Sequence, residues 1–317
     1  SLFTARNDGS DKVILTGPKA NDPRLMKLQV SWGPLLSPDG RLVVFCTWPP
    51  RKKTREKTFS ELWLVNDQGE LVNHTAVVLP ESPADDYSQT YVYLVGWLES
   101  ANLVLFDFHF RDVDRPTYVM VWDIDQNELR VLAKDVSLGF SSRSTAGEIM
   151  AARRRSADGT GWTLSVLSLK TGSLVDIWTE TNLVAELSGV RYVAAWDSRA
   201  QRLAFLVDRD NRPSVILGVY GWAEQKIISR RDLNRQDVGY TELAWTPDGR
   251  ELVVRNSRQK RLEFFDEKLE PTRFVAYPEG RRFFGLWAVG DRLLTYDERE
   301  NRLYRLDLKT EQWKRIY

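Results

Sequence analysis

The sequence is poor in the residues from which many metal and redox sites are built. It has one cysteine, Cys46, and two histidines, His74 and His109. A single cysteine excludes an intrachain disulfide and a cluster held by several thiolates, and two histidines are too few for a multi-histidine metal site. Because Cys46 follows the apolar run Val43–Phe45, we expect it to be a small buried side chain. We therefore expect no metal and no cofactor.

A strong charge of either sign is also absent. The chain has 45 Lys and Arg residues against 44 Asp and Glu residues, a net charge of +1. No overall field therefore draws it to nucleic acid or to an anionic membrane surface. No apolar run approaches the roughly 20 residues that span a bilayer. The composition argues against a membrane span and against nucleic acid as a partner, and it leaves a small-molecule ligand open.

Catalytic signatures are missing as well. The sequence has no Gly-x-Ser-x-Gly nucleophile elbow and no Gly-x-x-x-x-Gly-Lys-Ser/Thr phosphate-binding loop. These absences favour a protein that is not an enzyme, although they leave catalysis open. The chain begins Ser1-Leu2-Phe3, without Met, so we expect a processed chain or a piece of a longer protein. The residues themselves leave the compartment open.

What the sequence does contain is a repeated motif: an apolar strand, a tight turn and a second apolar strand. The turn is Ser/Thr-Pro-Asp-Gly-Arg in the two best copies, Leu36–Phe45 and Trp245–Val254, and degraded copies begin at Trp97, Trp196 and Trp287. Pro presets φ at one turn position and Gly supplies a positive φ at another, so the motif is structural. A recurring unit of this kind predicts stacked supersecondary elements that share one core.

Each copy continues into a third and a fourth apolar strand, bounded by Asp, Asn, Gly and Pro. Four-stranded units spaced about 40 to 60 residues apart predict an all-β fold, a β-propeller of four-stranded antiparallel blades. Six complete units occupy residues 25–317, and residues 1–24 predict either a partial blade or a closing hairpin. The blade number is therefore six or seven, and we expect a single domain over 1–317.

The turn at Ser37–Arg41 and its counterpart at Thr246–Arg250, each followed by a Leu-Val-Val run, resemble the TolB-type propeller repeat, a relative of the WD repeat. The resemblance covers nearly the whole chain. It implies a bacterial interaction module in an extracytoplasmic or periplasmic compartment, and it carries over no catalytic group. Some propellers of this type belong to larger peptidases, whose hydrolase domain this sequence does not contain.

The lengths of the connections predict which face of the propeller is functional. Turns between the first and second strands and between the third and fourth strands are tight, whereas the other two classes are long and leave one face. We expect this long-loop face to bind partners, because binding residues concentrate on loops held by a rigid scaffold. Its predicted loops are Pro49–Ser60, Pro80–Thr90, Phe110–Pro116, Arg153–Gly161, Arg230–Gly239 and Tyr277–Arg282.

These predicted loops are rich in Lys and Arg, which could hold an acidic protein segment, a polyanion or nucleic acid. The candidate binding residues there are Arg51, Lys52, Lys53, Arg55, Arg153, Arg154, Arg230, Arg231 and Arg282. Neighbouring aspartates such as Asp85 and Asp208 would neutralise part of this charge, so a merely solvated charged surface is the alternative.

Arg143 is a further binding candidate, because it stands where other units carry Trp and could hold an anion in the central channel. The alternative is that it pairs with a carboxylate and packs its aliphatic stem. The repeated tryptophans themselves predict packing between blades. Residues near the starts of the inner strands are candidates to line the channel mouth: Tyr91, Tyr93, Arg191, Tyr192, Glu242 and Phe283.

The sequence therefore favours a non-catalytic scaffold propeller that binds a protein partner, with an acidic one favoured by the basic loops. Arg and exposed aromatic side chains are the expected anchors, because these types dominate binding hot spots. One alternative is an enzyme or glycan-binding propeller that uses its central channel. Another is an accessory propeller of a catalytic domain that lies outside this sequence.

Overall fold

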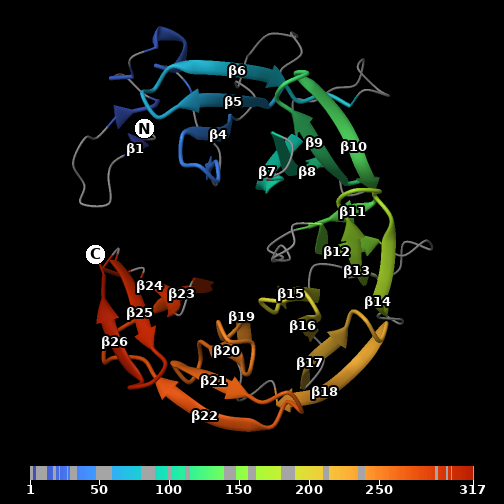
Figure 1. Cartoon of the computed structure of the whole chain (residues 1–317), viewed down its shortest axis with the longest axis vertical. Coiled ribbons are helices and arrows are strands. Elements are labelled where there is room, and N and C mark those ends of the chain that lie inside the picture. Colours follow the sequence, from blue (N-terminus) through green and yellow to red (C-terminus); the bar gives the residue numbers. More distant parts are fainter. Residues whose placement is uncertain are drawn as a thin grey trace. The chain divides into compact units, whose positions relative to one another are not determined.

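The computed structural model of the chain (Figure 1) describes residues 3–4, 13–16, 19–20, 22–26, 28, 34–47, 59–79, 90–98, 102–110, 115–138, 148–155, 162–179, 190–209, 214–234, 240–289, 292–297, 299–300 and 302–316. Over this part of the chain the only helix is a 3₁₀ turn, η1 (Pro23–Leu25), and all other regular structure is β-strand. The prediction of an all-β fold is confirmed.

The chain divides after Gly139 into two compact units. In the first unit, Ser1–Gly139, β1 (Phe3–Thr4) and β2 (Val13–Ile14) form a two-stranded sheet. The first blade consists of β3 (Leu35–Leu36), β4 (Leu42–Thr47), β5 (Glu61–Asn66) and β6 (Leu71–Ala76). The second blade consists of β7 (Thr90–Leu98), β8 (Leu103–Phe110), β9 (Tyr118–Asp123) and β10 (Glu128–Lys134), and β11 (Val136–Ser137) follows.

The second unit, Phe140–Tyr317, holds the strands from β12 onward. The third sheet has the order β11, β12 (Ile149–Arg155), β13 (Trp162–Ser168) and β14 (Leu174–Thr179). The fourth is β15 (Val190–Trp196), β16 (Arg202–Arg209), β17 (Ser214–Gly221) and β18 (Lys226–Asn234). The fifth is β19 (Tyr240–Trp245), β20 (Leu252–Asn256), β21 (Arg261–Phe265) and β22 (Pro271–Ala276). The sixth is β23 (Phe283–Val289), β24 (Arg292–Asp297), β25 (Arg302–Asp307) and β26 (Gln312–Arg315).

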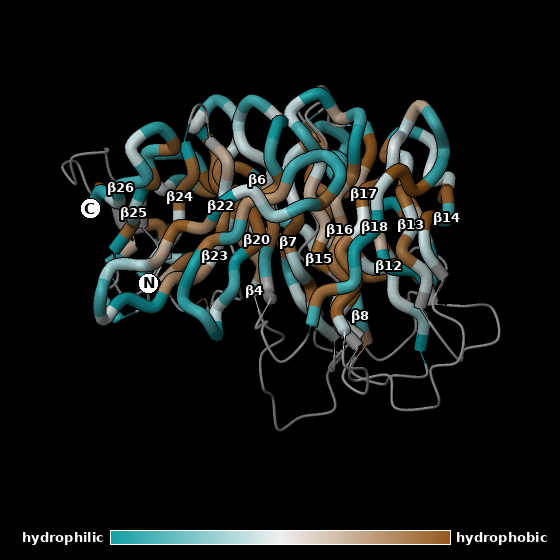
Figure 2. Tube along the Cα trace, turned by 90° about the horizontal axis from the view of Figure 1, so that it is seen from below, coloured by the Kyte–Doolittle hydropathy of each residue, from teal (hydrophilic) through white to brown (hydrophobic). Residues whose placement is uncertain are grey.

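The described residues thus form six four-stranded antiparallel sheets, each with its strands in chain order. Such a sheet is the blade that the repeated motif predicts. Strands that follow one another in the chain pair side by side, and each blade buries its faces against other blades. Figure 2 shows that hydrophobic residues lie along the strands, whereas hydrophilic residues form the turns that join them.

The register of the fifth blade shows which connections share an edge of the sheet. The second-to-third turn and the connections to neighbouring blades leave from one edge, which we call the long-loop edge, where four paired residues lie side by side: Tyr240, Asn256, Arg261 and Ala276. The tight-turn edge lies opposite. In this blade the second-to-third connection is itself a tight turn, Ser257–Lys260, so the prediction that this class of connection is long is wrong here.

The Ser-Pro-Asp-Gly turn has the structure that its residues predict. Gly40 adopts a φ of +75°, in the left-handed region, and its N–H donates to the Ser37 carbonyl at 2.9 Å. The Ser37 hydroxyl donates to Asp39 Oδ1 at 2.6 Å and accepts from the Leu42 N–H at 2.9 Å. The Ser37 hydroxyl, the Asp39 carboxylate and the Gly40 N–H therefore form hydrogen bonds within the turn, which confirms the structural role of the motif.

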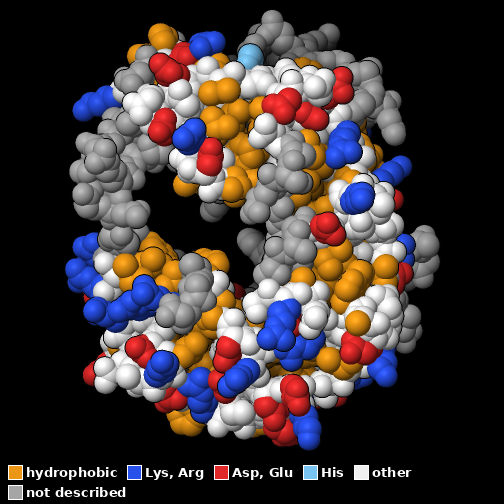
Figure 3. All heavy atoms as spheres, viewed as in Figure 1, with side chains coloured by type: hydrophobic (Ala, Val, Ile, Leu, Met, Phe, Trp, Pro, Cys, Tyr) orange, Lys and Arg blue, Asp and Glu red, His pale blue; other side chains and the backbone are white. Residues whose placement is uncertain are grey.

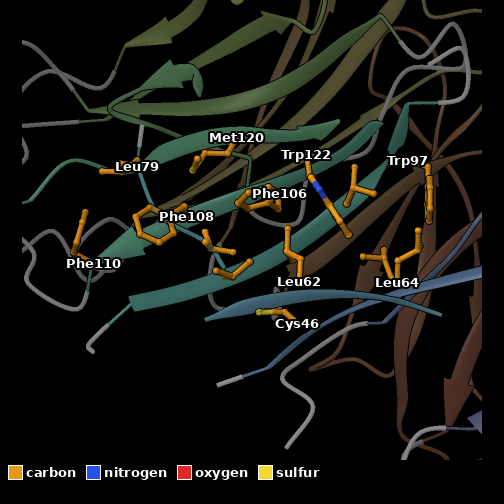
Figure 4. Packing of buried hydrophobic residues seen from close by; sticks show 14 residues of the cluster. Cys46, Leu62, Leu64, Leu79, Trp97, Phe106, Phe108, Phe110, Met120 and Trp122 are labelled. Carbon is orange, nitrogen blue, oxygen red and sulfur yellow. The ribbon is translucent and has the colours of Figure 1, made fainter. Parts of the chain in front are cut away.

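Apolar side chains pack between neighbouring blades, because alternate residues of a strand face opposite sides of the sheet. In the first unit, side chains of β4 and β5 contact side chains of β7, β8 and β9 (Figure 4). Cys46 is buried in this cluster beside Leu62, so the prediction of a small buried side chain is confirmed.

Three of the four repeated tryptophans pack between blades as predicted. Trp97 lies in the cluster of the first and second blades, and Trp196 lies between the third and fourth. Trp245 lies between the fourth and fifth blades, where its indole N–H donates to the Ala195 carbonyl at 3.0 Å.

Trp287 is the exception, with 49% of its surface exposed, and the prediction of a buried packing residue is wrong there. β23 has an irregular register between Phe284 and Trp287, and Gly285 adopts a φ of +69° within it. The Trp287 indole lies where a side chain at Gly285 would stand. The bulge therefore lays the Trp287 ring over Gly285 of its own strand.

The N-terminal segment packs on the first blade. Phe3 pairs with Ile14 in the hairpin that the sequence predicts, and this hairpin forms a sheet of its own. Beyond it, Leu25 of η1 joins a buried cluster with Phe45 and Trp63 of the first blade. Apolar residues of this segment thus cover one face of that blade.

Candidate functional site at the long-loop edge

Polar contacts join the fifth and sixth blades at the long-loop edge. Glu242 of β19 lies opposite Arg255 of β20 in the register of the sheet. Arg255 Nε donates to Glu242 Oε2 at 2.8 Å, and its Nη2 donates to Oε1 at 3.2 Å. Arg255 Nη1 donates to the Phe283 carbonyl of β23 at 2.7 Å, and the Gly285 N–H donates to Glu242 Oε1 at 3.0 Å. One ion pair therefore ties together the inner strands of two blades.

This pair is largely removed from water, with side-chain exposures of 5% for Arg255 and 26% for Glu242. Such charges are tolerated only when they are paired and hydrogen-bonded, and the two-point contact of a guanidinium with a carboxylate provides both. Nearby, burial raises the pKa of the Tyr277 phenol. These groups therefore act as scaffold between the blades.

Arg281 is held by two carboxylates of the sixth blade. Its Nη1 lies 3.4 Å from Oδ2 of the fully buried Asp297, and the same nitrogen pairs with Glu300. The Tyr304 hydroxyl donates to Glu300 Oε2 at 2.9 Å, so this carboxylate is itself fixed. The Glu300 contact raises the pKa of Arg281. The charge of Arg281 is therefore neutralised within the protein.

Arg282 differs from its neighbour. Its side chain is exposed, and within the described part of the chain it forms no ion pair and no hydrogen bond. Its guanidinium carbon lies 5.3 Å from the centre of the Phe284 ring, and the guanidinium carbon of Arg255 lies at the same distance from that ring. Phe284 thus contacts one buried, paired cation and one exposed cation. Arg282 presents a positioned positive charge to solvent.

The long-loop edge of the second blade is aromatic instead. Tyr93 is 44% exposed, and its ring lies 6.4 Å from that of Tyr91 with an interplanar angle of 23°. The His109 ring stands nearly perpendicular to Tyr93, at 87° and a centroid distance of 5.5 Å. In the register, Tyr91 lies opposite His109 and Tyr93 lies opposite Asp107, so all four side chains share one face of the sheet.

Asp107 supports this aromatic group from the interior. Its side chain is 1% exposed, and it accepts hydrogen bonds from Ser137 Oγ at 3.0 Å and from the Leu138 N–H at 2.9 Å. Its Oδ2 also lies 3.6 Å from His109 Nε2. The carboxylate therefore holds β8 against the chain at β11 and orients the imidazole.

The structure places the residues expected to line the channel mouth in different environments. Tyr91, Tyr93 and Glu242 lie at the long-loop edge as their place in the sequence suggests. Phe283 is buried against Tyr277, so the expectation that it lines a channel is wrong. The side chains of Arg191 and Tyr192 lie outside the described residues.

Arg153 and Arg154 belong to β12, so the predicted loop from Arg153 onward is wrong for these residues. Successive residues of a strand face opposite sides of the sheet, which separates the two cations. Arg153 lies opposite Leu164, whereas Arg154 pairs with Asp176 of β14. The two residues therefore do not form one basic patch.

Arg230 and Arg231 are likewise on a strand, β18, rather than in the predicted loop. Arg230 lies 3.3 Å from Asp232 and 5.0 Å from the centre of the Trp178 ring, toward the third blade. Arg231 pairs with Glu270 at 2.6 Å, toward the fifth blade. The aliphatic part of an arginine on a strand can pack on the sheet while its guanidinium group pairs with a carboxylate.

The remaining binding candidates lie outside the described residues. They are Arg51, Lys52, Lys53, Arg55 and Arg143. Among the described candidates, Arg282 is the one that is placed in a connection of the long-loop edge with its charge unpaired.

Sequence reasoning missed two residues, Asp107 in the first unit and Arg255 in the second. Each stands alone as a charge inside an apolar strand, Arg255 after Leu252–Val254 and Asp107 within Leu103–Phe110. A charge at such a position must find a partner once the strand is buried. That pattern is the signal that could have identified them.

The described surface carries a mixture of charges, and Figure 3 shows Lys and Arg side chains interspersed with Asp and Glu over β18–β22 and a gathering of Lys and Arg over β24–β26. Within the described residues, no three His, Cys, Asp or Glu side chains come together as metal ligands would. No helix in that part of the chain has the length and apolar character needed to cross a membrane.

No model of a protein family and no curated protein matches the chain. Among solved structures it is similar to a chain from a structural and mechanistic analysis of two prolyl endopeptidases, with a TM-score of 0.59, 14% identity and coverage of 96% of this chain and 42% of that one. It is similar to the Dos1 propeller with a TM-score of 0.54, 10% identity and coverage of 92% and 70%.

A third similar structure is the β-propeller domain of the Trilobed protease from Pyrococcus furiosus, which is described as having an open velcro topology. The TM-score is 0.50, the identity is 16%, and the coverage is 71% of this chain and 72% of that one. At such identities the similarity establishes the fold alone. Six four-stranded sheets in chain order among the described residues, together with these propeller neighbours, identify the fold as a β-propeller.

Proposed function

We propose that this propeller is a non-catalytic interaction module that binds an acidic segment of a protein partner at its long-loop edge. The observation that carries the proposal is Arg282, an exposed cation held at the ring of Phe284 and left unpaired within the described residues. Arg on an aromatic support is a frequent binding hot spot, because its charge is presented without a large loss of conformational freedom on binding.

The surroundings of Arg282 support a protein ligand. The neighbouring cations Arg255 and Arg281 are neutralised by carboxylates, so one directed charge faces solvent instead of a broad basic field. A polyanion such as nucleic acid is held by many phosphate contacts at once. A short acidic segment needs only one or two charge-assisted hydrogen bonds, to which a guanidinium contributes in a two-point geometry.

The finer assignment follows the repeat. We propose that the chain is a bacterial TolB-type propeller of an extracytoplasmic compartment, with one domain over 1–317 and residues 1–24 as a partial blade or closing hairpin. The Ser-Pro-Asp-Gly turn at Ser37–Gly40 and its internal hydrogen bonds support the TolB-type repeat.

The test uses a fluorescently labelled Glu-rich peptide as the probe and measures its anisotropy with the intact chain. Arg282→Glu should weaken binding about tenfold or more, corresponding to about 1.4 kcal/mol. Arg250→Glu is the matched control, because Arg250 is an exposed arginine at the tight-turn edge of the fifth blade and its reversal changes the net charge equally. An equal loss in both variants would show a non-specific charge effect, and binding unaffected by Arg282→Glu would refute the proposal.

A further inference from the structure

Tyr93 forms a second recognition feature, in the first unit, that does not depend on Arg282. Large aromatic side chains are usually buried, yet nearly half of this one is exposed at the long-loop edge. Its ring is nevertheless held in place, since Tyr91 lies almost parallel on one side and His109 stands perpendicular to it. An exposed ring fixed by two other rings is preorganised for a ligand.

The buried carboxylate below gives this aromatic group its electrostatic character. Asp107 lies opposite Tyr93 on the same face of the sheet, in a site almost free of water. It accepts hydrogen bonds from Ser137 Oγ and the Leu138 N–H, and its Oδ2 lies 3.6 Å from His109 Nε2. The pKa of Tyr93 is raised by desolvation first, and then by Tyr91 and Asp107, which agrees with a negative potential at the ring.

We propose that Tyr93, with His109 at its edge, is a binding site for an organic cation, above all for the guanidinium group of an Arg side chain on a protein partner. The face of an aromatic ring attracts cations through its quadrupole, and a guanidinium can also stack flat on it. The negative charge of Asp107 adds to this attraction, whereas it gives no advantage to a neutral ligand.

Cation–π contacts elsewhere among the described residues show the same chemistry with internal partners. Arg273 lies 3.9 Å from the centre of the Phe264 ring, Arg261 lies 4.8 Å from that of Phe274, and Arg202 lies 4.5 Å from that of Trp245. Tyr93 instead has an imidazole at its edge and an exposed surface. An external guanidinium would occupy this ring as internal ones occupy the others.

The two histidines provide a specific readout. His109 contacts Tyr93, whereas His74 stacks on Trp63 in the first blade at a centroid distance of 4.9 Å and serves as an internal control. With ¹³C-labelled histidine, the imidazole resonances are followed while N-acetyl-arginine amide is added. We expect a saturating shift of His109 and a stationary His74. N-acetyl-citrulline amide has nearly the same shape without the charge and should produce no shift.

Variants locate the effect on the ring. Tyr93→Phe keeps the aromatic face and should retain binding, whereas Tyr93→Leu should weaken it about fivefold or more. Phe274→Leu, which removes another exposed aromatic residue, is the control and should leave the titration unchanged. Thermal melting of each variant verifies that the chain remains folded.

Several outcomes would overturn the proposal. These are equal shifts of both histidines, equal responses to arginine and citrulline, a shift that persists in Tyr93→Leu, or a response to maltose without one to arginine, which would indicate a carbohydrate-stacking site. Choline distinguishes the source of the cation. Binding of the arginine amide in preference to choline supports a protein side chain, and the reverse preference would overturn that choice in favour of a small quaternary amine.

Discussion

Arg255 and Glu242 form a two-point ion pair, Nε to Oε2 at 2.8 Å and Nη2 to Oε1 at 3.2 Å, in which both partners also bind backbone of the next blade. The pair connects the fifth and sixth blades through side chains rather than through a shared sheet. The pair stabilises this contact because it satisfies polar groups that become buried when the two blades pack together.

Removal of either partner of this pair should destabilise the protein strongly. Arg255→Ala leaves the Glu242 carboxylate without its counter-ion and the Phe283 carbonyl without its donor, and we expect a loss of about 3–5 kcal/mol in the free energy of unfolding. Urea denaturation measures it. Arg250→Ala, which removes the exposed Arg250–Asp248 pair, is the control and should cost less than about 1 kcal/mol. Similar losses in the two variants would mean that the buried pair does not join the blades.

The two tryptophans at equivalent positions of the repeat should respond differently to truncation. Trp245→Ala removes a buried indole and a hydrogen bond between blades, and it should cost about 3–5 kcal/mol. Trp287→Ala removes a ring that is half exposed and should cost much less. Urea denaturation of both variants compares them directly. A loss for Trp287→Ala as large as that for Trp245→Ala would show that Trp287 packs in a core after all.

The fold was predictable because its signals are local. The Ser37–Gly40 turn closes through its own hydrogen bonds, and Gly40 has the positive φ that its residue type allows. The position of Trp287 was not predictable in the same way. It depends on a bulge at Gly285, and nothing in the repeat distinguishes a residue that follows a bulge from one in a regular strand.

The candidate site was only partly predictable. Clusters of arginine in the sequence predict loops, because charged residues are uncommon in buried strands. In Arg153 and Arg154 the alternation of the strand places the two charges on opposite faces, where each can reach solvent or a carboxylate. The role of Asp107 depends on contacts with Ser137 and Leu138, about 30 residues away in the chain, which no local pattern reveals.

The turn aspartates should give the protein a defined response to acid. The Thr246 hydroxyl donates to Asp248 at 2.7 Å and lowers the pKa of that carboxyl below its ordinary value of 3.8. A carboxyl with a lowered folded-state pKa contributes stability above the ordinary value, and this stability is lost as the pH falls through the folded value. Thr246→Val should therefore raise the pKa of Asp248, as measured by NMR titration. Asp39, whose pKa is lowered by Ser37 in the other copy of the turn, is the internal control and should not change. An unchanged Asp248 would show that the hydroxyl does not set its pKa.

Asp107→Asn should loosen the junction between β8 and the chain at β11. The carboxylate accepts from both Ser137 Oγ and the Leu138 N–H, whereas an amide offers one acceptor oxygen and turns its NH₂ toward a donor. We expect a loss of about 1–3 kcal/mol in unfolding free energy, because a buried donor is left unsatisfied. Hydrogen exchange locates the effect, since the Leu138 amide should exchange faster in this variant. Ser137→Ala removes only the hydroxyl contact and should leave the Leu138 amide protected. Equal protection of Leu138 in Asp107→Asn and in the unmodified protein would mean that the backbone, and not Asp107, holds this junction.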